Sequence, residues 1–263
     1  MEILELSLSP PDARFKSASQ IARVSTEAWA LRCLYCPSCG LELTSYPQGT
    51  KVYDFFSLSC KERFQLKSGA HMFSHSVLGS ELHTTLNSVL SGQQPSMFLL
   101  HYDRIKWTVE DLMVIHRSCI TTSCIIPRKP LSSTARRAGW QGCIYSLDRI
   151  PKLGQIEVID QGVIREKAEI LAQWKQSDSL LRTKPELRGW VADILTCVER
   201  LPSTFKLDDM YAFEDELGKK HRDNHNIRPK IRQQLQVLRD LGLVNFVSPG
   251  VYEYLGKTNA SWQ

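Results

Sequence analysis

The 263-residue sequence lacks the features that mark membrane proteins, secreted proteins and small disulfide-rich proteins. No apolar run approaches the roughly 18 residues needed to cross a bilayer. The first fifteen residues, MEILELSLSPPDARF, have no basic segment and no long apolar segment of the kind found in secretory signals, so we expect a cytoplasmic protein that does not engage a membrane. The eight cysteines are spread over a long chain, which favours metal binding over disulfides.

Neither sign of charge dominates the composition, because 33 basic residues oppose 28 acidic ones and leave a net charge of +5. This mild basicity, with an isoelectric point near 8.7, favours nucleic acid over a neutral partner. The hydrophobic fraction of 42% and the charged fraction of 23% are ordinary for a globular protein. The length suggests one large domain or two modest ones.

A short cysteine motif, Cys36-Pro-Ser-Cys39-Gly40, is typical of a zinc knuckle. Two thiolates separated by two residues and followed by a turn glycine suit tetrahedral zinc. A second such pair is incomplete, because Cys60 is present but Ser57 stands three positions before it. The fourth ligand stays open: it is Cys33, His71 or His75, or the site is degenerate. The alternative to a zinc site is a set of buried thiols.

Downstream of the knuckle, two short apolar strands carry polar residues. The first, at residues 53–56, contains Asp54, and the second ends in Gln65, Leu66 and Lys67. Side chains alternate faces along a strand, so Gln65 and Lys67 point the same way while Leu66 points into the core. If the strands pair, a carboxylate, an amide oxygen and an ammonium converge, as in PD-(D/E)xK nucleases. The alternative for Asp54 is a bend or edge residue.

Helical spacing of apolar residues predicts a first helix at 17–31, and this helix carries Glu27. Glu27 either adds to a metal site at Asp54 or is a solvated helix charge. Further on, short apolar strands alternate with helices, which indicates a mixed α/β sheet. The expected elements are a loop at 71–80, helices at 82–90 and 166–174, and strands at 97–102, 112–116 and 156–160.

Residues 128–142 combine basic residues, hydroxyls, glycines and one tryptophan with little that could be buried. Basic side chains and hydroxyls suit phosphates, and an exposed tryptophan can stack on bases. We therefore expect Arg136, Arg137 and Trp140 to contact DNA. The alternative is a solvated loop with Trp140 placed in the core.

After a polar, proline-terminated linker at 177–185, the pattern changes to three helices followed by a hairpin. The apolar positions predict helices at 187–198, 207–217 and 227–241, then strands at 243–247 and 251–255. This order is that of a winged helix-turn-helix. Arginine and glutamine make bidentate contacts with base edges in the major groove. The third helix offers Arg228, Lys230, Arg232, Gln233, Gln234, Gln236 and Arg239.

These motifs together resemble the DpnI-like family of methyl-directed restriction endonucleases. The likeness covers most of the chain, and its longest run has an unusual composition that chance explains poorly. The matching stretches are residues 35–40, 54–55, 66–68, 128–131, 134–140, 188–190, 209–211 and 230–236.

The resemblance implies an α/β (α+β) PD-(D/E)xK nuclease domain with a structural Zn²⁺ at residues 1–182. It also implies a winged-helix DNA-binding domain at residues 183–257. Asp54, Gln65 and the Leu66 carbonyl would bind Mg²⁺, with Mn²⁺ as a substitute, and Lys67 would assist the attacking water. The zinc ligands would be Cys36, Cys39, Cys60 and Cys33.

The implied substrate is double-stranded DNA carrying N6-methyladenine in methylated GATC sites, inside a prokaryotic cell. We expect a monomer in solution and no small-molecule substrate. Two residues depart from the family: Gln65 replaces a metal-binding glutamate and Ser57 replaces a zinc cysteine. Because Gln65 removes one negative charge, the rival hypothesis is a catalytically lapsed methyl-DNA-binding protein or transcriptional repressor.

Overall fold

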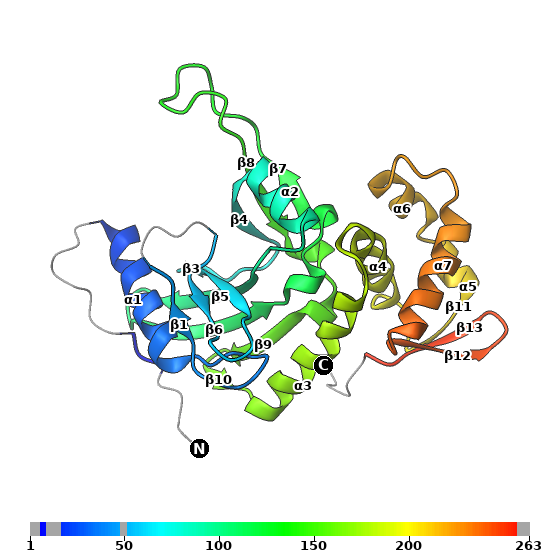
Figure 1. The fold of residues 1–263 in the computed structure, drawn as a ribbon, viewed down its shortest axis with the longest axis horizontal. Helices are drawn as coiled ribbons and strands as arrows, with labels where there is room; N and C mark the ends of the chain where they lie inside the picture. The colour runs from blue at the N-terminus through cyan, green and yellow to red at the C-terminus, as the bar shows by residue number, and fades with distance from the viewer. Residues whose placement is uncertain (1–5, 9–16, 48–51, 257–263) are drawn as a thin grey trace. The chain divides into compact units, whose positions relative to one another are not determined.

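The computed structural model describes residues 6–8, 17–47 and 52–256, so the expectation about the N-terminal signal lies largely outside it. The chain divides into two compact units, which are described separately (Figure 1). The first unit comprises Met1–Val77, Gln93–Arg117 and Gly154–Lys175, and the second comprises the remaining residues. No helix in the described part of the chain is long and apolar enough to cross a membrane.

The first unit is built on a seven-stranded sheet with the order β1-β2-β3-β5-β6-β9-β10. Strands β3 and β5 are parallel, whereas the other neighbouring pairs are antiparallel. The strands are β1 Thr44–Ser45, β2 Phe55–Phe56, β3 Arg63–Gly69, β5 Ser96–Asp103, β6 Thr108–Ile115, β9 Gln155–Asp160 and β10 Val163–Ile164.

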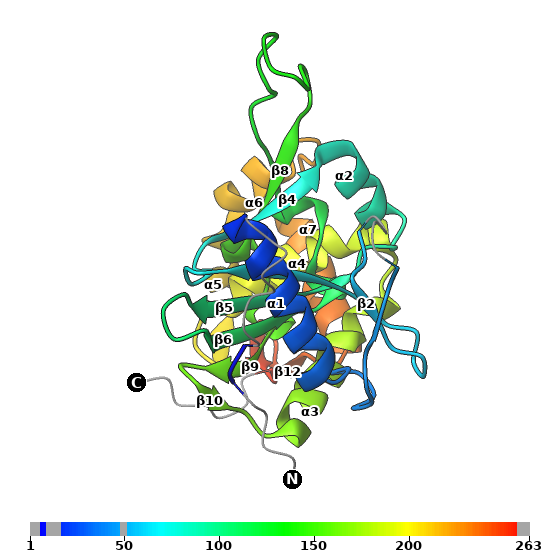
Figure 2. The same ribbon diagram turned by 90° about the vertical axis from the view of Figure 1, so that its left-hand side faces the viewer.

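One face of this sheet is covered by helices α1 (Ala18–Cys33) and α3 (Lys167–Asp178). Figure 2 shows α1 lying across the strands. Trp29 of α1 and Trp174 of α3 join one buried cluster with Phe64 and Phe98, whose rings stack at 4.9 Å. Because residues alternate faces along a strand, this packing leaves Gln65 and Lys67 on the opposite face.

The second unit contains a three-stranded sheet with the order β4-β8-β7 and a helix beside it. These elements are β4 Ser76–Glu81, α2 Leu82–Leu90, β7 Ile125–Pro127 and β8 Gly142–Ser146. Short 3-10 helices span Arg117–Cys119, Thr122–Cys124, Leu147–Arg149, Lys152–Gly154 and Ser179–Arg182. The hairpin between β7 and β8 extends well beyond the ends of both strands (Figure 1).

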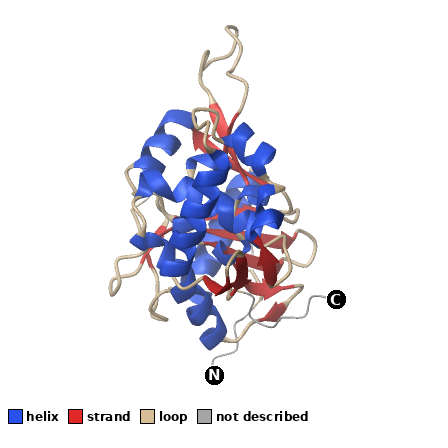
Figure 3. Ribbon diagram, turned by 90° about the vertical axis from the view of Figure 1, so that its right-hand side faces the viewer, coloured by secondary structure: helices blue, strands red, loops and turns tan. Residues whose placement is uncertain are grey.

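The rest of the second unit has the element order of a winged helix. Its elements are α4 Pro185–Val198, β11 Thr204–Lys206, α5 Leu207–Tyr211, α6 Glu214–Lys220, α7 Ile227–Asp240, β12 Val244–Ser248 and β13 Val251–Tyr254. The three strands form a sheet of order β11-β13-β12, and Figure 3 shows them beside the helices. Ile194, Met210, Leu217 and Leu235 are buried, and Gly242, with a φ of +75°, ends α7.

Most of the expected elements are present, but three expectations are wrong. The loop expected at residues 71–80 instead contains most of strand β4. Gly79 is needed there because Cys143 lies too close for a larger side chain. The helix expected at 207–217 is divided into α5 and α6, because the acidic run after Phe213 suits a new helix N-terminus. The segment 177–185 is no polar linker, since it continues α3 and buries Leu180.

Candidate active site, metal centre and nucleic-acid interface

The predicted pairing of the two polar strands is confirmed. Strand β2 runs antiparallel to β3, with Phe55 opposite Phe64. Asp54 lies one residue before β2, where its backbone N–H donates to the Phe64 carbonyl at 2.9 Å. The strand expected at 53–56 is reduced to β2, and Asp54 lies in a bend before it, which was the alternative for this residue. The charge of Asp54 interacts with that of Lys67 on β3.

The Asp54 carboxylate is fixed by the neighbouring strand. Its Oδ2 accepts a hydrogen bond from the backbone N–H of Leu66 at 2.8 Å. In a strand, the N–H and C=O of one residue point toward the same neighbour. The Leu66 carbonyl therefore also faces the side of β3 on which Asp54 lies. Gln65 and Lys67 are half-buried on the face opposite Phe64 and Leu66.

The electrostatics show a carboxyl that is costly to ionise. Burial raises the pKa of Asp54, against the opposing effects of the Leu66 N–H and of the positive charges of Lys67 and Arg23. The pKa of Glu27 on α1 is also raised. Burial is the main cause and the charge of Asp54 adds to it, whereas Arg23 acts in the opposite direction. Glu27 forms an ion pair with Arg23 at 3.0 Å. A divalent cation would offset the negative charge of the Asp54 and Glu27 carboxylates. Carboxylate oxygens are ligands that Mg²⁺ prefers, so these residues fit Mg²⁺.

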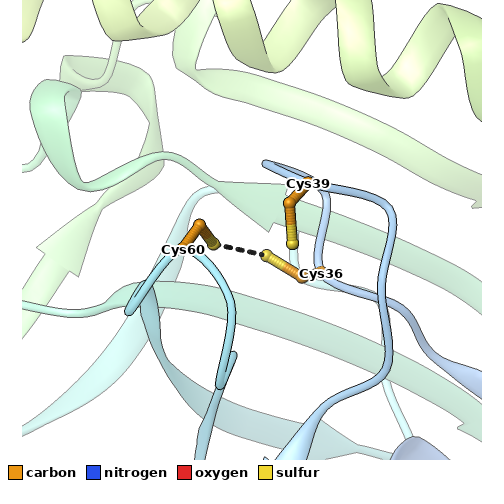
Figure 4. A group of neighbouring side chains, drawn as sticks. All are labelled: Cys36, Cys39 and Cys60. Carbon is orange, nitrogen blue, oxygen red and sulfur yellow. Dashed lines mark hydrogen bonds between the residues drawn. The ribbon is translucent and has the colours of Figure 1, made fainter.

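Three cysteines converge at one point in the first unit (Figure 4). The Sγ atoms of Cys36, Cys39 and Cys60 all lie within 4.8 Å of one another. The Sγ atoms of Cys36 and Cys60 are 3.5 Å apart. Burial raises the pKa of the Cys36 thiol. Burial also acts to raise the pKa of Cys39, but hydrogen bonds from Ser57 and the Leu41 N–H outweigh it and lower that pKa to about 7. Three thiols at this spacing could hold zinc.

The fourth position of this cluster differs from expectation. Cys33, at the end of α1, is not part of the convergent group, and neither are His71 and His75, both of which are exposed. The Oγ of Ser57 instead lies 3.4 Å from the Sγ of Cys39. The eight cysteines, all in the described part of the chain, form no disulfide.

Residues 128–141 form the extended hairpin between β7 and β8. Backbone hydrogen bonds hold its stem, as between the Arg128 N–H and the Gly142 carbonyl at 2.9 Å. Arg136 and Arg137 are exposed, and the Arg137 guanidinium lies 4.9 Å from the centre of the Trp140 ring. Trp140 packs on Gly142 and is partly covered. It is therefore neither fully exposed for stacking on bases nor placed in the core.

On α7, the predicted third helix, most of the proposed base-reading residues are accessible. Arg228, Arg232, Gln233, Gln236 and Arg239 are exposed, and Lys230 is half-buried. Gln234 differs, because it is only 5% exposed, and its place in the DNA-reading set is not supported. The helical spacing puts Gln234 on the inner face with Ile231 and Leu238, a distinction that residue type alone does not reveal.

Two aromatic residues beside α7 were not expected as part of this surface. Arg228 lies 4.9 Å from the ring centre of Tyr211, and Lys230 lies 5.8 Å from that of Trp190. Arg232 also donates to the Tyr211 hydroxyl at 3.3 Å. The stretches 188–190 and 209–211 that carried the family likeness therefore support the third helix. Trp190 lies on α4 and Tyr211 on α5, so their place beside α7 follows from the packing of the helices and has no local signal in the sequence.

A mixed α/β unit with a convergent cysteine group, followed by a winged helix-turn-helix, defines a DNA-binding protein. Comparison with protein families agrees with this class. Residues 4–183 match the family model described as DpnI, Dam-replacing family, and residues 186–254 match the Dam-replacing HTH domain. The chain belongs to the Dam-replacing family.

Proposed function

We propose that the protein is a Mg²⁺-dependent endonuclease that cleaves double-stranded DNA containing N6-methyladenine, with GATC as the methylated site. The observation that supports the proposal is the position of the Asp54 carboxylate, which accepts from the N–H of Leu66, the residue between Gln65 and Lys67 on β3. Family membership supports the substrate class. The boundary at 182/183 between nuclease and winged helix belongs to the same proposal.

The roles of the residues follow from their positions. Asp54, Gln65 and the Leu66 carbonyl would hold Mg²⁺, which when bound supplies a Lewis acid and an activated water. Lys67, on the same face as Gln65, stabilises negative charge that develops on the phosphate. The Leu66 N–H keeps the Asp54 carboxylate in one orientation, which reduces reorganisation during reaction.

Recognition is divided between two surfaces of the second unit. The exposed arginines and glutamines of α7 would read base edges, as side chains of a recognition helix do. Arg136, Arg137 and Trp140 in the β7–β8 hairpin would contact the DNA backbone and bases. Zn²⁺ at Cys36, Cys39 and Cys60 would stabilise the fold of the first unit.

The test incubates methylated and unmethylated plasmid with the protein in Mg²⁺ and in Mn²⁺. The proposal expects cutting of the methylated plasmid alone. A specific observation favours a second candidate, a catalytically lapsed methyl-DNA binder, because Gln65 provides a dipole where a glutamate provides a charge. If the wild type cuts in neither metal while Gln65→Glu does, the binder hypothesis is correct.

A further inference from the structure

The two turns that carry the cysteines have the same construction. In the first turn, the Cys36 thiol accepts hydrogen bonds from the backbone N–H groups of Ser38 and Cys39. Gly40 follows with a φ of +75°, and its N–H donates to the Cys36 carbonyl at 2.7 Å. These features present the two sulfur atoms on the same side of a tight turn.

The second turn repeats three of these features, with serine in the first position: a backbone N–H to the side chain three residues earlier, a left-handed residue after the turn, and that residue's N–H bond to the first carbonyl. The Ser57 Oγ accepts from the Cys60 N–H at 3.4 Å, as the Cys36 thiol accepts from Cys39. Lys61 follows with a φ of +63°, and its N–H donates to the Ser57 carbonyl at 3.1 Å. A lysine in this left-handed conformation is disfavoured relative to glycine, so the surrounding structure must hold the turn.

The Ser57 hydroxyl is therefore placed where a knuckle places its first ligand. Its side chain is fully buried, and its Oγ lies 3.4 Å from the Sγ of Cys39. Among the described residues, no fourth thiol, imidazole or carboxylate joins Cys36, Cys39 and Cys60. A buried hydroxyl in contact with the Cys39 thiol, at the ligand position of the second turn, can complete a tetrahedral set.

We propose that Ser57 Oγ is the fourth ligand of a three-thiolate, one-oxygen zinc site, and that Cys33 is not a ligand. This inference rests on the zinc occupancy proposed above but not on nuclease activity. A neutral hydroxyl has less negative charge and a shorter reach than a thiolate. The site therefore holds zinc less tightly, and exchanges it faster, than a four-cysteine site does.

The test uses the full chain, stripped of metal and reloaded with Co²⁺ or Zn²⁺. Charge-transfer absorption from thiolate to Co²⁺ reports the number of sulfur ligands, and competition with a chelator reports the affinity for Zn²⁺. Ser57→Cys should increase the absorption by about a third, because a fourth thiolate completes the set. It should also raise zinc affinity by about tenfold or more. Ser57→Ala should keep the absorption but weaken zinc binding.

Cys33→Ser is the matched control and should leave both readouts unchanged. The proposal is overturned if Cys33→Ser lowers the absorption, or if Ser57→Ala binds zinc as tightly as the wild type. It is also overturned if the wild type binds no zinc. Should Ser57→Cys fail to fold, Ser57→Thr retains the hydroxyl and should bind zinc like the wild type, whereas a loss equal to that of Ser57→Ala would contradict the proposal. DNA cleavage enters none of these readouts.

Discussion

At the scale of single residues, the two proposed metal centres each include a neutral oxygen, that of Gln65 in one and that of Ser57 in the other. At the proposed nuclease centre, the Leu66 N–H holds the Asp54 carboxylate in place at 2.8 Å. The expected consequence at both centres is weaker metal binding with an intact frame.

Gln65→Glu tests this consequence at the nuclease centre. Restoring the second carboxylate should lower the Mg²⁺ concentration for half-maximal cleavage by about tenfold, because affinity follows ligand charge. Mn²⁺ should narrow the gap between the two proteins, since it binds mixed ligands more tightly. A metal titration of cleavage rate measures both effects. Equal Mg²⁺ requirements would remove Gln65 from the ligand set.

Arg23 provides a test based on pH. Cleavage requires ionised Asp54, and burial raises the pKa of this carboxyl, so activity should fall as the pH drops through a value above the ordinary one for aspartate. Arg23 opposes this shift. Arg23→Gln should therefore move the acid limb of the pH–rate profile further upward, by less than about one unit. Arg32→Gln, on the same helix, is the control, and an unmoved limb in Arg23→Gln would contradict the assignment.

At the scale of elements, the β7–β8 hairpin is where substitutions should change DNA binding without changing stability. Arg136 and Arg137 are exposed. Replacing both with alanine should weaken DNA binding at low salt and reduce the slope of log affinity against log salt by about 2, with little change in melting temperature. Binding titrations at several salt concentrations measure this. Arg104→Ala, on a turn of the first unit, is the control, and an unchanged slope in the double variant would place the hairpin away from DNA.

Sequence reasoning identified elements whose patterns are strong and local. The CPSCG knuckle, the strand ending in Gln65 and Lys67, and the third helix with its wing have short-range signals. It missed β4 because a glycine and several polar residues suggested a loop, whereas the pairing with β8 depends on residues more than sixty positions away. The residue type of Gln234 suits a DNA-reading surface, whereas its helical spacing places it on the buried face of α7. The residue at the fourth position of the cysteine cluster, Ser57, could be identified only from the packing of the two turns.

At the scale of the whole molecule, the winged helix shares buried polar contacts with the segment Ser118–Leu153 of the same unit. Asp193 on α4 is almost fully buried and binds Ser123 at 2.7 Å and His221 at 2.8 Å, with Lys220 at 3.4 Å. Glu199 accepts from the backbone N–H groups of residues 152 and 153 at 2.7 and 2.9 Å. The winged helix is therefore not supported by its own residues alone.

The segment 183–257 should fold in isolation but with lower stability than in the full chain. Asp193 and Glu199 would lose partners that lie outside the segment. In the full chain, Asp193→Ala should cost roughly 3–5 kcal/mol of unfolding free energy, because it leaves buried partners uncompensated. Chemical denaturation measures both quantities. An isolated segment as stable as the full chain would show that these contacts contribute nothing.

The central claim is that Asp54, Gln65 and Lys67 hydrolyse methylated DNA. Single-turnover cleavage of a methylated duplex, at equal DNA occupancy, tests it most directly. Asp54→Asn keeps an acceptor for the Leu66 N–H, so it should bind DNA like the wild type yet fail to cut. Lys67→Met should slow cutting by about 10²–10³-fold. Cleavage by Asp54→Asn at the wild-type rate would contradict the account.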